Sequence, residues 1–124
     1  MKWVWLDQDV VLAVHEAQIA EHGGASGVRD TGLLESALAR PLNLDAYGRP
    51  DAAALAAAYA CGIAKNHPFI DGNKRTALVI AETFLELNDS ELKADNVACV
   101  DTMLQVAAGT MDEDSMAEWI RANL

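Results

Sequence analysis

The residue types with the greatest chemical potential in this chain are concentrated in residues 67–77, which read HPFIDGNKRTA. Gly72 allows the backbone to approach a ligand closely, and the free amides of the helical turn that follows it can bind an anion. Lys74 and Arg75 add two cations to the same turn, which suits the phosphates of a nucleotide. The stretch therefore predicts a phosphate-binding site.

The same stretch carries groups that could move a phosphoryl group. Asp71 offers a hard oxygen ligand for a Mg²⁺ ion that bridges phosphates, and Asn73 could hydrogen-bond either the loop or a phosphate oxygen. His67 has the side chain that titrates naturally near neutral pH, so it could take the proton of an attacking hydroxyl. In the structural alternative, His67 and Asp71 cap helix ends, Asn73 turns the chain, and Lys74 and Arg75 are solvated surface residues.

The elements that must position this stretch are helices. Ala, Leu and Glu dominate, and strict alternation is confined to the first few residues, so we expect an all-α bundle of about six helices in a single domain, residues 1–124. The segment Ala52–Ala64 is apolar nearly all round and must be surrounded by other helices. The stretch 67–77 is therefore expected between two central helices, at the rim of the core.

Capping residues and prolines predict where the helices begin and end. The expected helices are Gln8 to about Glu21 after Asp7, a second that begins at Asp30 or Thr31 and ends at Pro41, a third from Asp51 to near Asn66, Lys74–Leu87, a fifth from Asp95 to Gly109, and a last one from a capping box at Thr110 to Asn123. A connecting loop is expected from Pro41 to Pro50.

Composition and charge exclude several classes of function. The chain has 124 residues, 52% of them hydrophobic, which is enough apolar surface for one folded domain. Its 9 Lys and Arg against 19 Asp and Glu give a net charge of −10, which repels nucleic acid and anionic lipid. It has no apolar run of membrane-spanning length, and Asp7 and Asp9 interrupt any signal sequence in Met1–Asp9. We therefore expect a cytoplasmic protein that binds neither nucleic acid nor membranes.

Four further residues are given structural roles. His15 shares a helix face with apolar residues and is expected to be a partly buried packing histidine. His22 is expected to interact with the C-terminal end of its helix. Cys61 and Cys99 lie in apolar segments without a CxxC partner, which predicts buried free thiols.

The stretch 67–78 also resembles the signature of the Fic/Doc superfamily, H-P-F-x-[D/E]-G-N-G-R-x-x-R, which lies at the junction of two helices. It matches seven of the fixed positions and departs at two, with Lys74 in place of the second Gly and Leu78 in place of the final Arg. The variant N-K-R-T-A-L at residues 73–78 is similar to the death-on-curing (Doc) branch, the toxins of type II toxin–antitoxin systems. Residues 23–30 and 33–41 are similar to the N-terminal half of the same branch.

The resemblance implies a small Fic fold and an enzyme that transfers the γ-phosphate of ATP to a threonine of elongation factor Tu, with a cognate antitoxin whose C-terminal segment folds on binding. It leaves open whether Arg29 forms a buried pair with Asp30 or faces the substrate. The site residues it implies are His67, Asp71 and Arg75 for catalysis, Gly72, Asn73, Lys74 and Arg75 for the nucleotide, and Asp71 for Mg²⁺.

Two other functions remain open at this point. Most Fic enzymes transfer AMP and use the second Gly and the final Arg to seat the nucleotide, and neither residue is present here. Lys74 fills space that Gly would leave open, and loss of the Arg at position 78 removes a clamp for the far phosphates. The alternatives are an AMP transferase acting on a protein hydroxyl and a catalytically inactive Fic-fold interaction protein.

Overall fold

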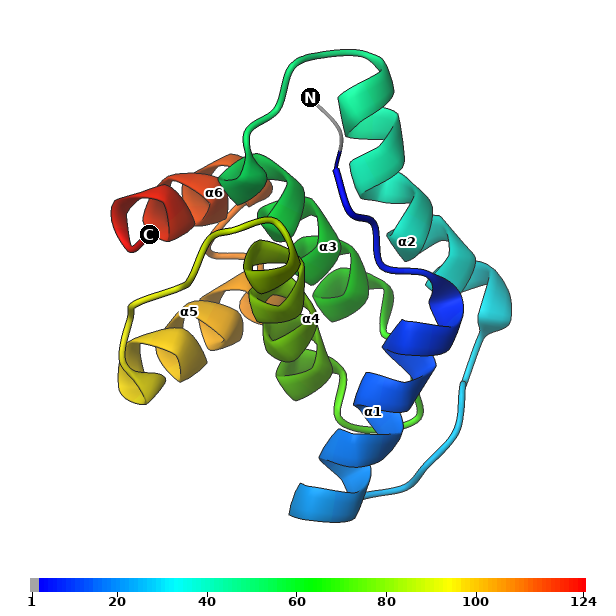
Figure 1. Cartoon of the computed structure of the whole chain (residues 1–124). Coiled ribbons are helices and arrows are strands. Elements are labelled where there is room, and N and C mark those ends of the chain that lie inside the picture. The colour runs from blue at the N-terminus through cyan, green and yellow to red at the C-terminus, as the bar shows by residue number, and fades with distance from the viewer. Residues whose placement is uncertain (1–2) are drawn as a thin grey trace.

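The computed structural model describes residues 3–124, and six α-helices account for most of them (Figure 1). The helices are α1 (Gln8–His22), α2 (Thr31–Ala46), α3 (Ala52–Asn66), α4 (Asn73–Leu87), α5 (Asn96–Ala108) and α6 (Glu113–Ala122). The only extended pairing among these residues is a single bridge between Val28 and Phe69. The predicted all-α class is confirmed. Met1 and Lys2, where the segment examined for a signal sequence begins, lie outside the described residues.

Aspartates begin five of the six helices. Each side chain accepts a hydrogen bond from a backbone N–H three residues further on, at Asp7, Asp30, Asp51, Asp95 and Asp112. The caps predicted from the sequence at Asp7, Asp51 and Asp95 are confirmed, and Asp30 is the cap of α2. Helix α4 differs, because it begins after Gly72 and no side chain caps its first turn.

Helix α3 lies at the centre of the bundle, as its sequence predicts. All residues from Leu55 to Cys61 are buried, and α2, α4 and α6 pack around the helix (Figure 1). A Cβ atom at Gly62 would lie 3.2 Å from the Cα atom of Ala37, so this glycine allows α2 to approach closely. The end of α3 therefore leads from the core directly into the loop that begins at His67.

Two predicted boundaries were wrong. Helix α2 does not end at Pro41 but continues to Ala46, with Pro41 buried and Leu44 packed against the core. A proline in a helix loses one backbone hydrogen bond, and here the packing of this apolar face outweighs that loss. The segment 41–50 is therefore a loop only in its last residues.

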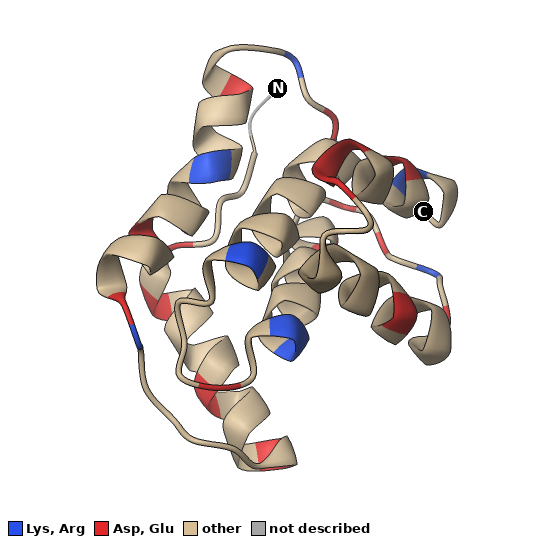
Figure 2. Cartoon of the chain, turned by 180° about the vertical axis from the view of Figure 1, so that it is seen from behind, with Lys and Arg blue, Asp and Glu red and all other residues tan. Residues whose placement is uncertain are grey.

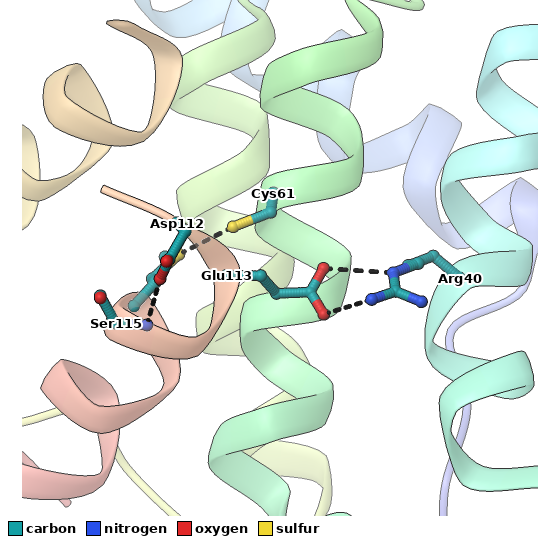
Figure 3. Close-up of polar contacts among 6 residues, drawn as sticks. Arg40, Cys61, Asp112, Glu113 and Ser115 are labelled. Carbon is teal, nitrogen blue, oxygen red and sulfur yellow. Dashed lines mark hydrogen bonds and ion pairs between the residues drawn. The ribbon is translucent and has the colours of Figure 1, made fainter. Parts of the chain in front are cut away.

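The second wrong boundary is the start of the last helix. Asp112, rather than Thr110, caps α6, because the Thr110 hydroxyl donates to the carbonyl oxygen of Gln105 at the end of α5. Helix α6 is tied to α2 by Arg40, whose guanidinium donates to both carboxylate oxygens of Glu113 at 3.2 and 2.8 Å (Figure 3).

Both cysteines are buried and free, as predicted. The Cys61 thiol lies 3.7 Å from the sulfur of Met116, between α3 and α6 (Figure 3). Burial raises the pKa of Cys61 to about 12. It is therefore a thiol and not a nucleophilic thiolate at neutral pH.

None of the helices in residues 3–124 has the length and apolar character needed to span a membrane. Lys and Arg positions are spread over several elements among acidic ones (Figure 2).

Candidate active site

The stretch 67–77 forms the loop between the two central helices and the first turn of α4. Helix α3 ends at His67, which adopts a left-handed conformation with φ 49° and whose N–H donates to the carbonyl oxygen of Ile63 at 3.2 Å. Gly72, with φ 73°, begins α4. Two left-handed residues therefore reverse the chain within six positions, with Pro68 and Phe69 buried and Ile70 and Asp71 exposed at the rim of the core.

Asn73 maintains the shape of this loop. Its side-chain oxygen accepts from the N–H of Phe69, and its side-chain nitrogen donates to the carbonyl of Phe69, both at 3.0 Å. The side chain is 7% exposed. Of the two roles considered for Asn73, bonding the loop is the one that its side chain performs, so a phosphate can contact this residue through its backbone amide.

A cleft of about 760 Å³ opens beside the loop and brings all six predicted site residues together. They are His67, Asp71, Gly72, Asn73, Lys74 and Arg75. The side chains of His67, Asp71, Lys74 and Arg75 are exposed. The rest of the wall comes from Ile70, from Gln18, Glu21 and His22 of α1, from Glu82 of α4 and Asn96 of α5, and from five apolar residues of α4 and α5, which are Leu78, Val79, Val100, Met103 and Leu104.

The first turn of α4 is the positively charged part of the cleft. Its backbone amides have no side-chain cap, and the helix dipole adds a partial positive charge at this end. Neither Lys74 nor Arg75 takes part in an ion pair within residues 3–124. A chain with a net charge of −10 thus presents two cations that form no ion pair among the described residues, together with free amides, at one place.

Asp71 presents its carboxylate at the same place. Its Oδ1 accepts from the N–H of Gly72 at 2.8 Å, and its Oδ2 accepts from the N–H of Ala25 at 3.3 Å. Asp71 is exposed in the cleft, and a single carboxylate of this kind fits the usual Mg²⁺ arrangement in which one protein carboxylate acts together with substrate phosphate oxygens. Within the described residues no group of three or more His, Cys, Asp or Glu side chains could hold a metal.

Arg29 stabilises the other end of the loop. Its Nε donates to the carbonyl of His67 at 2.8 Å, and an Nη nitrogen donates to the carbonyl of Asn66 at 2.9 Å. These are terminal carbonyls of α3, where a cation is favourable. Arg29 thus fixes the loop, through carbonyl oxygens and not through a pair with Asp30, which caps α2 instead.

The sequence analysis missed the contact that His15 makes with this loop. It is 1% exposed and packs its ring on Phe69, with centroids 3.8 Å apart and planes inclined by 6°. Burial was predicted, but its Nε2 also lies 2.8 Å from the carbonyl oxygen of Asp71. The sequence offered one signal for this contact. His15 lies on the same helix face as the apolar Val11, and a buried polar side chain requires a hydrogen-bond partner.

The comparisons with known proteins find relatives over most of the chain. A family model described as the Fic/DOC family matches residues 5–85, which contain the loop and most of α1 to α4. "Toxin Doc" of Mycolicibacterium smegmatis is 42% identical over 119 residues, covering 91% of this chain and 88% of that protein. "Protein kinase doc" of Escherichia phage P1 is 32% identical over 117 residues, covering 94% and 92% of the two chains.

Proposed function

The chain belongs to the Fic/DOC family, and from this premise we propose that it is the toxin of a toxin–antitoxin module, a kinase that transfers the γ-phosphate of ATP to a threonine hydroxyl of elongation factor Tu. The names of the two relatives, a toxin and a protein kinase, support the class. The observation that carries the proposal is that His67 faces the same cleft as the uncapped, cationic first turn of α4.

In this proposal the phosphates of ATP accept hydrogen bonds from the free amides after Gly72 and from the side chains of Lys74 and Arg75. Asp71 holds the Mg²⁺ that accompanies the nucleotide, and this ion neutralises phosphate charge when bound. Arg75 stabilises the charge that develops on the transferred group.

His67 acts as the general base. It takes the proton of the threonine hydroxyl while that oxygen bonds to the γ-phosphorus, and the bond from phosphorus to the β–γ bridging oxygen breaks, so ADP leaves. The exposed position of His67 lets a side chain on the surface of another protein reach it. Because elongation factor Tu acts in the cytoplasm, the proposal places this protein there as well.

Two positions favour γ-phosphate transfer over AMP transfer. Lys74 is exposed and lines the cleft where a glycine would leave the backbone open. Leu78 packs against the core at the cleft wall and offers no hydrogen-bond donor for far phosphates. AMP-transferring relatives use the second glycine and the final arginine of the signature to bind the nucleotide. A site without these two residues is expected to bind ATP in a different orientation.

Labelled ATP tests the proposal directly. The protein is incubated with Mg²⁺, elongation factor Tu and ATP labelled either at the γ- or at the α-phosphate. Label from the γ position on the factor supports the kinase, whereas label from the α position establishes the AMP transferase. Label from neither position overturns the proposed transfer to elongation factor Tu, and continued binding of the antitoxin would then fit the inactive interaction protein.

The antitoxin is proposed to bind the apolar side of the cleft. Val100 and Leu104 of α5 are 47% and 51% exposed although both are apolar. With Leu78 and Val79 they form one apolar wall, to which the apolar face of an amphipathic helix can bind.

A further inference from the structure

Residues of α1 and of the segment that follows it form hydrogen bonds with both the backbone and the side chain of Asp71. The peptide unit that joins Asp71 to Gly72 is hydrogen-bonded on both of its edges. Its carbonyl oxygen accepts from Nε2 of His15 at 2.8 Å, and its N–H donates to Oδ1 of the Asp71 carboxylate at 2.8 Å. Because a peptide unit is planar and rigid, an orientation imposed on its carbonyl also sets the direction of its N–H. His15 is therefore linked to the position of the carboxylate through a single rigid group.

The buried position of His15 makes this contact specific. A carbonyl oxygen only accepts hydrogen bonds, so the Nε2 atom of His15 must carry a proton. The ring cannot shift easily, because it is stacked on Phe69 and is 1% exposed. A buried imidazole nitrogen without a partner would destabilise the fold, which favours keeping the bond to Asp71.

The glycine-rich segment after α1 holds the other carboxylate oxygen. Oδ2 of Asp71 accepts from the N–H of Ala25 at 3.3 Å. A Cβ atom on Gly24 would lie 2.7 Å from the same oxygen, and Gly24 has φ 116°. Gly23 also has a positive φ, 84°, but a Cβ there would meet nothing within 4 Å. Of these two neighbouring glycines, only Gly24 leaves the room that the Asp71 carboxylate occupies.

We propose that His15 and Gly24 are positioning residues that set the orientation of the Asp71 carboxylate toward the cleft. Neither residue lines the cleft itself, so both act through Asp71. The consequence for Mg²⁺ binding rests on the function proposed above. The orientation of Asp71 does not, and it can be measured in the protein alone.

The first measurement is the protonation pattern of His15 by nitrogen NMR of the free protein. The expected result is a proton on Nε2 that exchanges slowly with solvent, because that nitrogen is buried and bonded to Asp71. A His15 ring protonated only on Nδ1 would overturn the proposal, since no bond to the carbonyl would then exist.

The second measurement compares Gly24→Ala with the matched control Gly23→Ala. Both changes place a side chain at a positive φ, so both are expected to lower the melting temperature. Only Gly24→Ala displaces the carboxylate, so hydrogen exchange of the Gly72 amide is expected to accelerate about tenfold in that variant alone. Equal exchange rates in the two variants would overturn the proposal, because the effect would then be backbone strain in general.

The third measurement follows Mg²⁺ affinity by calorimetry in the presence of ATP. His15→Phe keeps a stacking ring without a donor and is expected to weaken Mg²⁺ binding about tenfold, whereas His15→Gln, which keeps an N–H donor, recovers part of the loss. ATP binding in EDTA is expected to be unchanged in both.

Unchanged Mg²⁺ affinity in His15→Phe and Gly24→Ala would refute the positioning role and leave the kinase proposal standing. If the parent protein binds neither Mg²⁺ nor ATP, the kinase proposal fails, and the His15 and Gly72 measurements still decide the positioning role.

Discussion

The side chain of Asn73 forms two hydrogen bonds of 3.0 Å each with the backbone of Phe69. One side-chain amide therefore satisfies both the N–H and the carbonyl group of this buried residue. The same amide nitrogen lies 3.4 Å from Nδ1 of His67, which is long for a hydrogen bond. Asn73 therefore sets the loop geometry that presents His67 to the cleft.

Replacing Asn73 by Ala is expected to destabilise the fold. It removes both bonds and leaves the N–H and carbonyl of Phe69 without partners, which costs about 1–3 kcal/mol of unfolding free energy. Urea denaturation followed by circular dichroism measures this loss. The control is Asn43→Ala, at an exposed position on α2, which is expected to change the unfolding free energy little. Equal losses in the two variants would contradict the role of Asn73.

His67→Ala is expected to abolish transfer of the γ-phosphate while leaving the fold and most of the ATP affinity intact. The imidazole acts on the attacking hydroxyl and not on the nucleotide, so the loss of about 10²–10⁴-fold falls on kcat. Single-turnover transfer of label and calorimetry with ATP separate these two quantities. A variant that retains full transfer would remove His67 from the role of base.

Asp71→Asn is expected to lose Mg²⁺-dependent binding of ATP. The amide keeps the shape and an oxygen acceptor for the Gly72 N–H, but a neutral oxygen is a weaker ligand for a hard divalent cation. Titration of ATP at several Mg²⁺ concentrations checks this. The parent protein should show affinity that rises with Mg²⁺, and a variant with the same dependence would exclude Asp71 as the ligand.

The sequence predicted the fold best where the decisive interactions are local. An aspartate cap such as Asp51 or Asp95 bonds an amide three residues away, so it can be identified without the tertiary structure. The end of α2 was wrongly predicted at Pro41, because the helix accommodates this proline through burial against elements distant in sequence. Asp112 was missed as a cap because the Thr110–Glu113 spacing imitates a capping box.

The candidate site follows the same pattern. Its six predicted residues are nearly contiguous, so the fold of a single loop brings them together. The contribution of His15 lies 56 positions from Asp71 in sequence. The α5 wall of the cleft, with Val100 and Leu104, likewise depends on how α5 packs against α4. Neither contact can be derived from spacing alone.

Glu82 gives a prediction about pH. Burial, followed by the nearby Glu86 carboxylate, raises the pKa of Glu82 above its usual value. A carboxyl group with a raised folded-state pKa favours folding when protonated, so this contribution is present at low pH and is lost as pH rises through the folded-state pKa. Glu82→Gln is therefore expected to melt at a higher temperature than the parent at pH 7, with the difference shrinking toward pH 4.

The control for this measurement is Glu91→Gln, at an exposed position in the segment before α5. It removes the same unit of negative charge without the burial, so it separates the local effect from the relief of general repulsion. A difference in melting temperature that is equally large in the two variants, or that does not depend on pH, would contradict the explanation from burial of Glu82.

The apolar wall of the cleft predicts how an antitoxin segment binds. A segment that is disordered when free and helical when bound should show a large negative heat-capacity change together with a gain of helix in circular dichroism. Because the chain carries a charge of −10, cations on the partner are expected to contact the rim, so binding should weaken as salt is added. Calorimetry with the product of the neighbouring open reading frame, at several temperatures and salt concentrations, measures the heat-capacity change and the salt dependence, and circular dichroism measures the gain of helix.

Two leucines provide a matched pair for the same experiment. Leu104 lines the cleft and is 51% exposed, whereas Leu42 on α2 is 46% exposed and lies outside the cleft. Leu104→Glu places a charge in the apolar wall and is expected to weaken antitoxin binding at least about tenfold, as for a central interface residue. Leu42→Glu adds the same charge to the same protein and is expected to leave binding nearly unchanged. Equal weakening would indicate a general charge effect, and no weakening in either variant would exclude the α5 side of the cleft as the antitoxin site.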